Sequence, residues 1–287
     1  MKLGVYNAIL HDRSLPEAID VVASLGLTGI EVNSGGFLPP VHIPNLDEII
    51  ASKSAANDYL ALFAGTGVEI AGLNCNGNPL HPNPAIGLKH AEDIRRSIKA
   101  AAALGQTRVV TMSGLPGGEP GATRPNWIVN AWNSGSLDQL DYQWGVAAKL
   151  WSEIDKLARD NGVKVALVFH AAAKDIKVNP AAAVYGVLDN RFRKLDEDED
   201  RTNLGDDEWV NEWPKDSAWD FVALGKGHDT AFWTEFLRAL HEVDPDMAVN
   251  IEHEDVSLGR IEGLEIAARV LQAADAALSA TLSTGQR

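Results

Sequence analysis

Residues 249–255 read Val-Asn-Ile-Glu-His-Glu-Asp, so four ionisable side chains follow a short apolar run. The run 247–251 is typical of a buried strand, and the charges are expected where that strand meets solvent. Alternation along a strand predicts that Glu252 and Glu254 point to one side while His253 and Asp255 point to the other. The stretch therefore predicts either a binding site at a strand end or acidic residues that cap the following helix.

A strand followed by a helix recurs from the N-terminus onward. The first of these helices is expected to begin with a capping box, in which Ser14 and Glu17 satisfy each other's backbone N–H groups. A single helix is expected over about 45–65. Strands are expected at 2–10, 29–33, 68–74, 108–112, 163–170 and 247–251. Repeated β-α units predict a parallel sheet and an α/β fold of the (β/α) TIM-barrel type, in one domain covering 1–287.

The alternation of strand and helix stops after the fifth strand. Residues 171–220 form a charged, aromatic-rich segment with an acidic run at 196–200, and they show no clear βα unit. A closed barrel of this type has eight strands, whereas about six are recognisable in this chain. The sequence therefore predicts an incomplete barrel with an irregular segment at 171–220.

Composition limits the partners and the compartment. With 45% apolar residues the chain has ample material for a core, and 25 Lys+Arg against 40 Asp+Glu give a net charge of −15. This acidity argues against nucleic acid or an anionic membrane as partner and favours a small-molecule substrate. The single Cys75 excludes an internal disulfide and a multi-cysteine metal site. Because no signal peptide or membrane span is recognisable, a cytoplasmic protein is expected, and a homo-oligomer is left open.

Polar residues at the carboxyl ends of the expected strands are the candidates for a site, because barrels of this kind carry their active sites there. A carboxylate and an imidazole from separate strands suit a divalent cation such as Mn²⁺, Mg²⁺ or Co²⁺. Glu252 and His170 are the predicted metal ligands, although His170 is equally compatible with a core position. The polar residues at strand ends are Asn7, Glu31, Asn74, His81, Ser113, His170, Glu252 and His253.

Three further segments carry candidate residues. Lys174 and Asp175 could place an ammonium and a carboxylate near a substrate, or form a solvated ion pair. His228 lies in a glycine turn before Asp229, which can cap the next helix, so a ligand contact and a simple turn are both open. The long loop 113–137 contains Trp127, and its glycines lack the Lys-Ser/Thr ending of a phosphate-binding loop.

Taken together, five motifs resemble the sugar phosphate isomerase/epimerase family with the xylose isomerase-like TIM barrel. They are residues 72–82, 110–114, 169–175, 225–229 and 251–255. The resemblance implies sugar metabolism with a divalent metal at the barrel mouth and proton or hydride transfer beside a carbonyl. It implies catalytic roles for Glu252, Lys174 and His228, metal ligation by Glu252 and His170, and substrate contacts from Asn74, His81, Trp127, Asp175 and His253.

The sequence departs from that family after Leu167, where the fifth strand runs directly into the motif that contains His170. An internal deletion of roughly 40–50 residues is implied, because one βαβ unit takes about 30 residues or more. Two expected metal ligands, a Glu and an Asp, have no counterpart, and Ala172 stands where many relatives carry a second histidine. The metal is then expected to be weakened or lost.

Three functions remain open from the sequence. The first is a metal-dependent isomerase or epimerase of a sugar or sugar derivative. The second is a lyase subunit that cleaves a C–O or C–C bond of an oxidised glycoside, with the tryptophans at 127, 132 and 144 stacking on an aglycone. The third is a non-catalytic, internally deleted relative that has lost the metal site.

Overall fold

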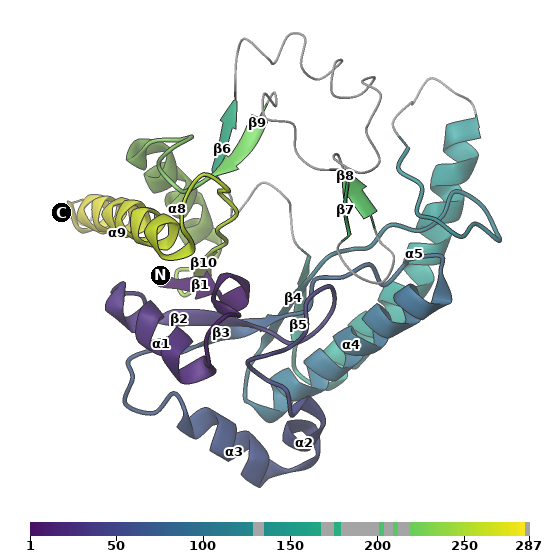
Figure 1. Ribbon diagram of the computed structural model, residues 1–287, viewed down its shortest axis with the longest axis horizontal. Helices are drawn as coiled ribbons and strands as arrows, with labels where there is room; N and C mark the ends of the chain where they lie inside the picture. The colour runs from purple at the N-terminus through teal and green to yellow at the C-terminus, as the bar shows by residue number, and fades with distance from the viewer. Residues whose placement is uncertain (129–134, 168–174, 179–200, 204–208, 212–218, 285–287) are drawn as a thin grey trace. The chain divides into compact units, whose positions relative to one another are not determined.

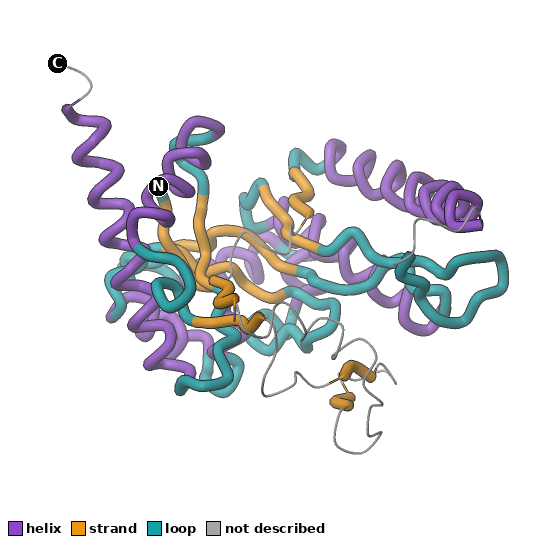
Figure 2. The backbone as a smooth tube through the Cα atoms, turned by 90° about the horizontal axis from the view of Figure 1, so that it is seen from above, coloured by secondary structure: helices purple, strands orange, loops and turns teal. Residues whose placement is uncertain are grey.

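The computed structural model describes residues 1–128, 135–167, 175–178, 201–203, 209–211 and 219–284. Strands and helices alternate along the chain as far as β5 (Figures 1 and 2). None of the described helices is long and apolar enough to cross a membrane. The elements are β1 (Lys2–Tyr6), η1 (Asn7–Leu10), α1 (Leu15–Ser24), β2 (Gly29–Asn33), α2 (Leu46–Ala51), α3 (Lys53–Ala61), β3 (Glu69–Asn74), α4 (Pro84–Ala103), β4 (Arg108–Thr111), α5 (Gly135–Asp160), β5 (Lys164–Leu167), β6 (Asp175–Val178), β7 (Arg201–Asn203), β8 (Trp209–Asn211), β9 (Trp219–Val222), α8 (Thr230–Val243), β10 (Ala248–Ile251) and α9 (Arg260–Thr284).

Six strands follow one another in a single sheet in the order β10-β1-β2-β3-β4-β5. β10 pairs in parallel with β1, and β4 pairs in parallel with both β3 and β5. The expected α/β fold with an incomplete parallel barrel is confirmed, because the described residues supply six of the eight strands that close such a barrel.

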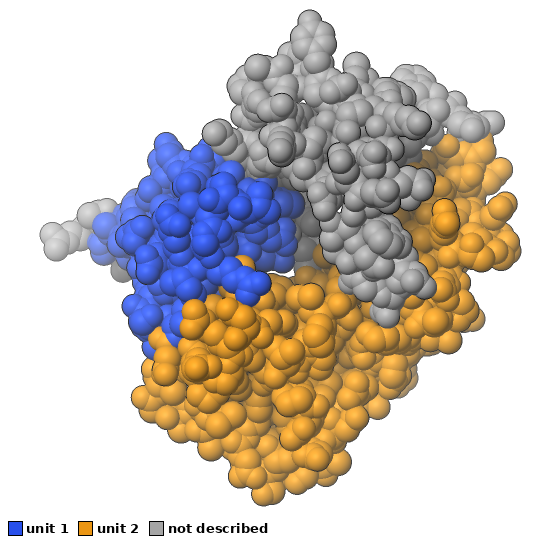
Figure 3. Space-filling view, in the orientation of Figure 1, with its two compact units in different colours: residues 1–5, 21–29, 170–287 blue, residues 6–20, 30–169 orange. Residues whose placement is uncertain are grey.

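The chain separates into two compact units, which Figure 3 colours differently. Unit 1 comprises residues 1–5, 21–29 and 170–287, and unit 2 comprises residues 6–20 and 30–169. Three of the boundaries between the units fall inside elements, namely β1, α1 and β2. The expected single domain over 1–287 stays a prediction.

Local capping signals place the helix starts correctly. The backbone N–H of Ser14 donates to the Glu17 carboxylate at 2.8 Å, which confirms the capping box before α1.

The single helix expected over 45–65 is instead two helices, because Ser52 has extended backbone angles and its hydroxyl accepts from the N–H of Ala55 at 3.3 Å. A residue that caps a new helix cannot also lie in the interior of the preceding one.

Unit 1 is built around two helices that pack against each other, α8 and α9. Asp229 caps α8 as expected, with its carboxylate accepting from the N–H of Phe232 at 2.9 Å. The Gln272 amide on α9 donates to the carbonyls of Leu25 and Gly26 at 2.8 and 3.1 Å, which fixes α9 against the end of α1.

The segment expected to be irregular contains four short strands. β6 pairs with β9 and β7 pairs with β8, both antiparallel. These strands do not continue the parallel βα alternation. Sequence reading missed them because runs of three or four residues interrupted by charges carry little periodic signal.

β5 marks the point in unit 2 where the βα alternation ends. Parallel strands are normally covered on both faces, yet Lys164, Ala166 and Leu167 are exposed, Leu167 to 51%. On the preceding helix α5, an apolar stripe with helical spacing is also exposed: Leu137 66%, Leu140 42% and Trp144 67%. These are surfaces that a following βα unit could cover, which agrees with the interruption predicted after Leu167.

Substitutions on the buried face of α5 should lower the free energy of unfolding much more than substitutions on its exposed stripe. We expect Ile154→Ala, which empties a fully buried position, to lower the free energy of unfolding by about 2–5 kcal/mol. Trp144→Glu, on the exposed stripe of the same helix, should change it by about 0.5 kcal/mol or less. Urea unfolding followed by circular dichroism measures both. A large loss for Trp144→Glu would show that the stripe is packed in solution.

Candidate functional site

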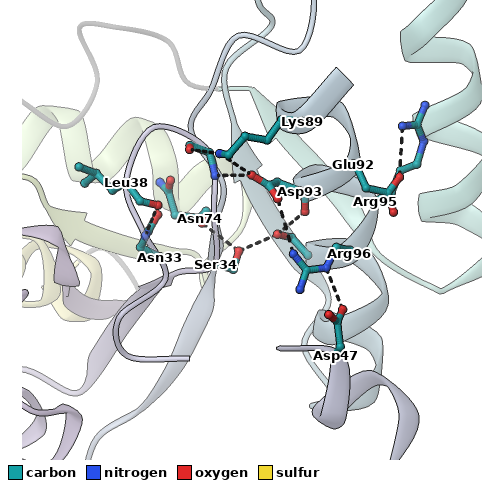
Figure 4. A network of polar contacts seen from close by, with 12 residues as sticks. Asn33, Ser34, Leu38, Asp47, Asn74, Lys89, Glu92, Asp93, Arg95 and Arg96 are labelled. Atoms are coloured by element: carbon teal, nitrogen blue, oxygen red, sulfur yellow. Dashed lines mark hydrogen bonds and ion pairs between the residues drawn. The ribbon is translucent and has the colours of Figure 1, made fainter. Parts of the chain in front are cut away.

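A buried amide fixes the carboxyl end of β2 in unit 2. The Asn33 side chain donates from Nδ2 to the carbonyls of Leu38 and Pro39 at 3.1 and 3.0 Å. Its Oδ1 accepts from the Tyr6 hydroxyl at 3.3 Å. Every polar atom of the amide is therefore used, and the loop after β2 is held back against its own strand (Figure 4).

Asn7 and His42 continue this network. Asn7 Oδ1 accepts from the backbone N–H of Asn33 at 2.8 Å, and Asn7 Nδ2 lies 2.7 Å from His42 Nδ1. The other ring nitrogen, Nε2, lies 2.9 Å from the carbonyl oxygen of Arg13. Because a carbonyl can only accept, Nε2 carries the hydrogen and Nδ1 accepts from the amide. Both partners of His42 thus specify one neutral tautomer.

Glu31 and Asn74 form a buried pair on neighbouring strands. Asn74 Nδ2 donates to Glu31 Oε1 at 2.7 Å, and Asn74 Oδ1 accepts from the N–H of Asn76 at 3.0 Å. The two residues are only 8% and 3% exposed. Asn74 was a predicted substrate residue. From the sequence, Glu31 was a candidate only as a polar residue at the end of a strand. Its pairing with Asn74 follows from the position of β2 next to β3 in the sheet.

A charged network holds α4 against the loop after β2 (Figure 4). The Asp93 carboxylate accepts from the backbone N–H of Gly36 and from Lys89, both at 3.2 Å, and pairs with Arg96. Gly36 has a φ of +87°, and a Cβ there would lie 2.0 Å from the Asn76 carbonyl oxygen. Only glycine allows this approach, which presses the loop onto the residues that follow β3.

Asn78 joins the loops that follow β3 and β4. Its Oδ1 accepts from the N–H of Leu115 at 2.8 Å, and its Nδ2 donates to the Leu115 carbonyl at 3.1 Å. His81, a predicted substrate residue, lies a few residues further on and lines a cavity of about 520 Å³ between α4 and α5, together with Arg95 and Lys149. The structure therefore places His81 in the wall of a helix–helix cavity.

In unit 1, the motif after β10 has the predicted alternation. His253 and Asp255 are 7% and 4% exposed, Glu252 is half-buried and Glu254 is exposed. Glu252 follows the last residue of β10 directly. The carboxylate chosen from the sequence as the main catalytic candidate thus lies at a strand end, as predicted.

Asp255 has a structural role in this motif. Its carboxylate accepts from the backbone N–H groups of Ala223 and Ser257 at 3.0 and 2.9 Å, and from the Ser257 hydroxyl. Burial alone would raise its pKa, but the hydrogen bonds from Ser257 and Ala223, with the Lys226 charge, lower the pKa below its ordinary value. Asp255 therefore fixes the residues after β9 to the end of β10.

His253 packs tightly against α9. A Cβ added at Gly263 would lie 2.0 Å from His253 Cε1, so the ring lies directly on the helix backbone. Its Nδ1 has no hydrogen-bond partner among the described residues. Burial lowers the pKa of His253, outweighing the opposite effects of Asp255 and Glu254. The position supports a packing role for this predicted substrate residue.

The remaining predicted residues are dispersed or lie outside the described part. His228 stacks on Phe232 with ring centroids 4.1 Å apart, in the turn that Asp229 ends by capping α8. Trp127 is 72% exposed. His170 and Lys174 lie outside the described residues, and only the backbone of Asp175 is described, at the start of β6.

A metal centre is not assembled by the described residues. They contain no group of three or more His, Cys, Asp or Glu side chains that could hold a metal ion. Glu252, the described member of the predicted ligand pair, lies in unit 1, and Glu31 lies in unit 2. The divalent cation expected from the sequence stays a prediction.

Comparisons with known proteins match this chain to one family model, one curated protein and several solved structures. The family model for the Xylose isomerase-like TIM barrel matches residues 19–184, more than half of the chain. Among curated proteins, the uncharacterized protein YfiH of Bacillus subtilis (strain 168) is 26% identical and is covered over 98% of its length by 95% of this chain. A Xylose isomerase domain protein from Planctomyces limnophilus has a TM-score of 0.51 at 12% identity, with 97% of this chain and 98% of that chain covered. A D-tagatose 3-epimerase-like protein has a TM-score of 0.52 at 18% identity, with 97% and 100% covered. At such identities the two structures support the fold alone.

The alignment with YfiH is longer than this chain. It spans 328 positions and covers 95% of this chain's 287 residues, about 273, so about 55 positions lie opposite no residue of this chain. This total is of the same order as the deletion of roughly 40–50 residues inferred from the sequence, whose place after Leu167 stays a prediction.

The contact between His253 and α9 predicts opposite effects for two helix glycines. We expect Gly263→Ala to lower the free energy of unfolding by about 1–3 kcal/mol, because the methyl group overlaps the buried ring. Gly145→Ala is the control: no atom lies within 4 Å of the added Cβ, and alanine should stabilise α5 by about 0.5–1 kcal/mol. Urea unfolding measures both. If the contact is real, His253→Ala restores part of the stability lost in Gly263→Ala.

The lowered pKa of His253 also predicts a pH dependence. The unfolded chain takes up a proton near the ordinary value of 6.5, whereas the folded chain takes it up only at lower pH. The neutral, buried His253 ring therefore makes its full contribution to the free energy of unfolding above about pH 6.5. That contribution is lost as the pH falls from 6.5 through the lower pKa of the folded chain. Between about pH 7.5 and 5.5 the melting temperature of the wild type should fall more than that of His253→Asn. The pKa of Asp255 is lowered, so this carboxylate affects stability only at lower pH. An equal fall in melting temperature for the wild type and His253→Asn would contradict the assignment to His253.

Proposed function

Because the chain belongs to the xylose isomerase-like TIM barrel family, we propose that it is an isomerase or epimerase that acts on a sugar or a sugar derivative. The observation that supports this proposal is the hydrogen-bonded network of amide, hydroxyl and carboxylate side chains at the carboxyl ends of β1, β2 and β3. Barrels of this kind carry their active sites at these strand ends, and the network would fix the side chains that face a substrate there. The name of one structural relative, a D-tagatose 3-epimerase-like protein, points to the same substrate class.

Asn74 is the proposed substrate-recognition residue in unit 2. One N–H of its amide is used by Glu31, and its oxygen is used by Asn76. No described residue accepts from the second N–H, and on this proposal it donates to a substrate hydroxyl. Glu31 fixes the direction of that donor because the amide cannot rotate without breaking the bond to the carboxylate.

Glu252 is the proposed base. It takes a proton from the carbon next to the substrate carbonyl; the electron pair left behind forms a carbon–carbon double bond and the carbonyl π electrons move to the oxygen, giving an enediolate. Protonation of the same carbon on the opposite face, from solvent, inverts that carbon. Return of the proton by Glu252 to the former carbonyl carbon, with the neighbouring hydroxyl proton passing to the enediolate oxygen, moves the carbonyl. A divalent cation, for which Glu252 and His170 are the proposed ligands, would supply polarisation of the carbonyl when bound.

A second candidate function is a non-catalytic relative that keeps a carbohydrate-binding scaffold. The observations that favour it are the roughly 55 alignment positions without a residue in this chain and the exposed faces of β5 and α5. On this hypothesis, the hydrogen-bond network of unit 2 would still bind a polyol, while proton transfer would be absent.

Deuterium exchange tests the base directly. With ketose substrates and saturating Mn²⁺ in D₂O, we expect NMR to detect deuterium entering next to the carbonyl. Glu252→Gln should slow this exchange by roughly 100- to 10,000-fold, the range for loss of a general base. Glu254→Gln removes an exposed carboxylate two residues away and should leave the rate unchanged.

The same assay separates the alternatives. Absence of exchange with every ketose, combined with saturable sugar binding by calorimetry, would contradict the isomerase and support the non-catalytic scaffold. Release of an aglycone from an oxidised glycoside would instead support a lyase. Calorimetric titration with Mn²⁺, repeated on Glu252→Gln, shows whether that carboxylate is also a metal ligand.

A further inference from the structure

One buried histidine on α4 contacts the loops that follow β2 and β3. His90 is 1% exposed, and its Nδ1 accepts from the backbone N–H of Asn78 at 3.0 Å. The ring of Phe37, in the loop after β2, meets the imidazole edge-on, with ring centroids 5.2 Å apart and an interplanar angle of 81°. None of the roles proposed above uses this histidine.

The hydrogen bond to Asn78 fixes the orientation of the ring. A backbone N–H can only donate, so Nδ1 of His90 carries no hydrogen and faces the loop after β3 as an acceptor. The same loop packs closely on the ring, because a Cβ added at Gly77 would lie 3.0 Å from His90 Cγ. A side chain on α4 and the backbone after β3 are thus fitted to each other.

Asn78 extends this contact to the loop after β4. Its side chain pairs with both backbone groups of Leu115, accepting from the N–H at 2.8 Å and donating to the carbonyl at 3.1 Å. Its Oδ1 also accepts from the N–H of Leu80 at 3.2 Å. Asn78 is only 7% exposed, so breaking these bonds would leave buried polar groups without partners. The loop after β4 is therefore fixed at Leu115.

The order at Leu115 continues along the loop to an exposed tryptophan. The N–H of Asn126 donates to the carbonyl of Pro116, which follows Leu115, at 2.9 Å. The Gln143 amide on α5 donates to the Asn126 carbonyl at 2.6 Å. Trp127 comes next in the chain, and its side chain is 72% exposed. The start of the loop and this tryptophan are consequently joined by hydrogen bonds.

The loops that meet at His90 follow neighbouring strands, since β2, β3 and β4 are adjacent in the sheet. They are also joined directly, because the N–H of Phe37 donates to the carbonyl of Asn76 at 2.7 Å. Barrels of this kind carry their active sites in the loops at these strand ends. A substrate there would meet the loops, whereas the His90 ring is too deeply buried to touch it.

We propose that His90 is a positioning residue for sugar binding, which sets the place of the loop after β4 through Asn78. This inference rests on the sugar-directed function proposed above. Loss of the Nδ1 acceptor should let the loop move and weaken binding of the sugar. The proton transfer assigned to Glu252, which lies outside these loops, should keep its rate, so KM is expected to change and kcat is not.

Two substitutions separate the acceptor atom from the volume of the ring. His90→Leu removes the acceptor, and His90→Asn keeps an oxygen in the place of Nδ1. In His90→Leu, hydrogen exchange followed by NMR should show the amides of Asn78 and Leu115 exchanging roughly tenfold faster, because local opening of the loop becomes easier. The amide of Cys75, which donates to the Val110 carbonyl at 2.8 Å, is the internal reference and should keep its rate.

The same variants test the effect on sugar binding, with D-tagatose and D-fructose as probes. His90→Leu should weaken binding about three- to tenfold, read as KM in the D₂O assay or as Kd in calorimetry, while kcat changes less than about twofold. His90→Asn should restore most of the affinity. Ile94→Val, one turn further along α4 at a fully buried position, is the matched control: it lowers stability through packing alone and should leave the affinity unchanged.

Asn78→Ala tests the same contact from the other side. It should free the Leu115 amide and weaken sugar binding by a similar factor, and adding His90→Leu should weaken it little further, because both act through one contact. Equal acceleration of the Cys75 amide, or faster loop exchange with unchanged affinity, would overturn the positioning role. Absence of sugar binding by the wild type would instead overturn the proposed function, and the Leu115 amide would still decide whether His90 holds the loop.

Discussion

Satisfaction of buried amides is the constraint on which the carboxyl ends of β1 and β2 depend. Asn33 is 1% exposed and its side chain uses both N–H groups and its oxygen within the protein. A buried amide that lacked these partners would be strongly destabilising, because it would lose its hydration without replacement. The loop at 38–39 and the Tyr6 hydroxyl are consequently held in one arrangement, and Asn7 extends that order to His42.

Sequence reasoning succeeded where the signal was local. The capping box at Ser14, the cap at Asp229 and the alternation after β10 each depend on residues within a few positions of one another. The Glu31–Asn74 pair joins residues 43 positions apart, and it exists only because β2 and β3 end side by side. Such pairs require strand order and register, which composition and periodicity do not supply. The break at Ser52 was missed because apolar spacing continues across it.

The interruption after β5, which the sequence predicted together with an open sheet edge, leaves exposed surfaces on β5 and α5. Covering helices normally make a parallel strand apolar and buried, but three residues of β5 and one stripe of α5 are exposed. An uncovered strand at a sheet edge favours pairing with other chains. The polar network at the ends of β1 to β3 is made entirely within unit 2, so it does not require the strands that are missing from the described part.

His42 ends this network on the side of the loop before α2. Its two ring nitrogens are bound to Asn7 and to the Arg13 carbonyl, so a rotation of the ring breaks at least one of these hydrogen bonds. Asn7 and His42 are 0% and 4% exposed, so a broken bond would leave a polar group without a partner where water does not replace it. The order at the end of β2 is therefore fixed through Asn7 and His42 as far as the backbone of Arg13.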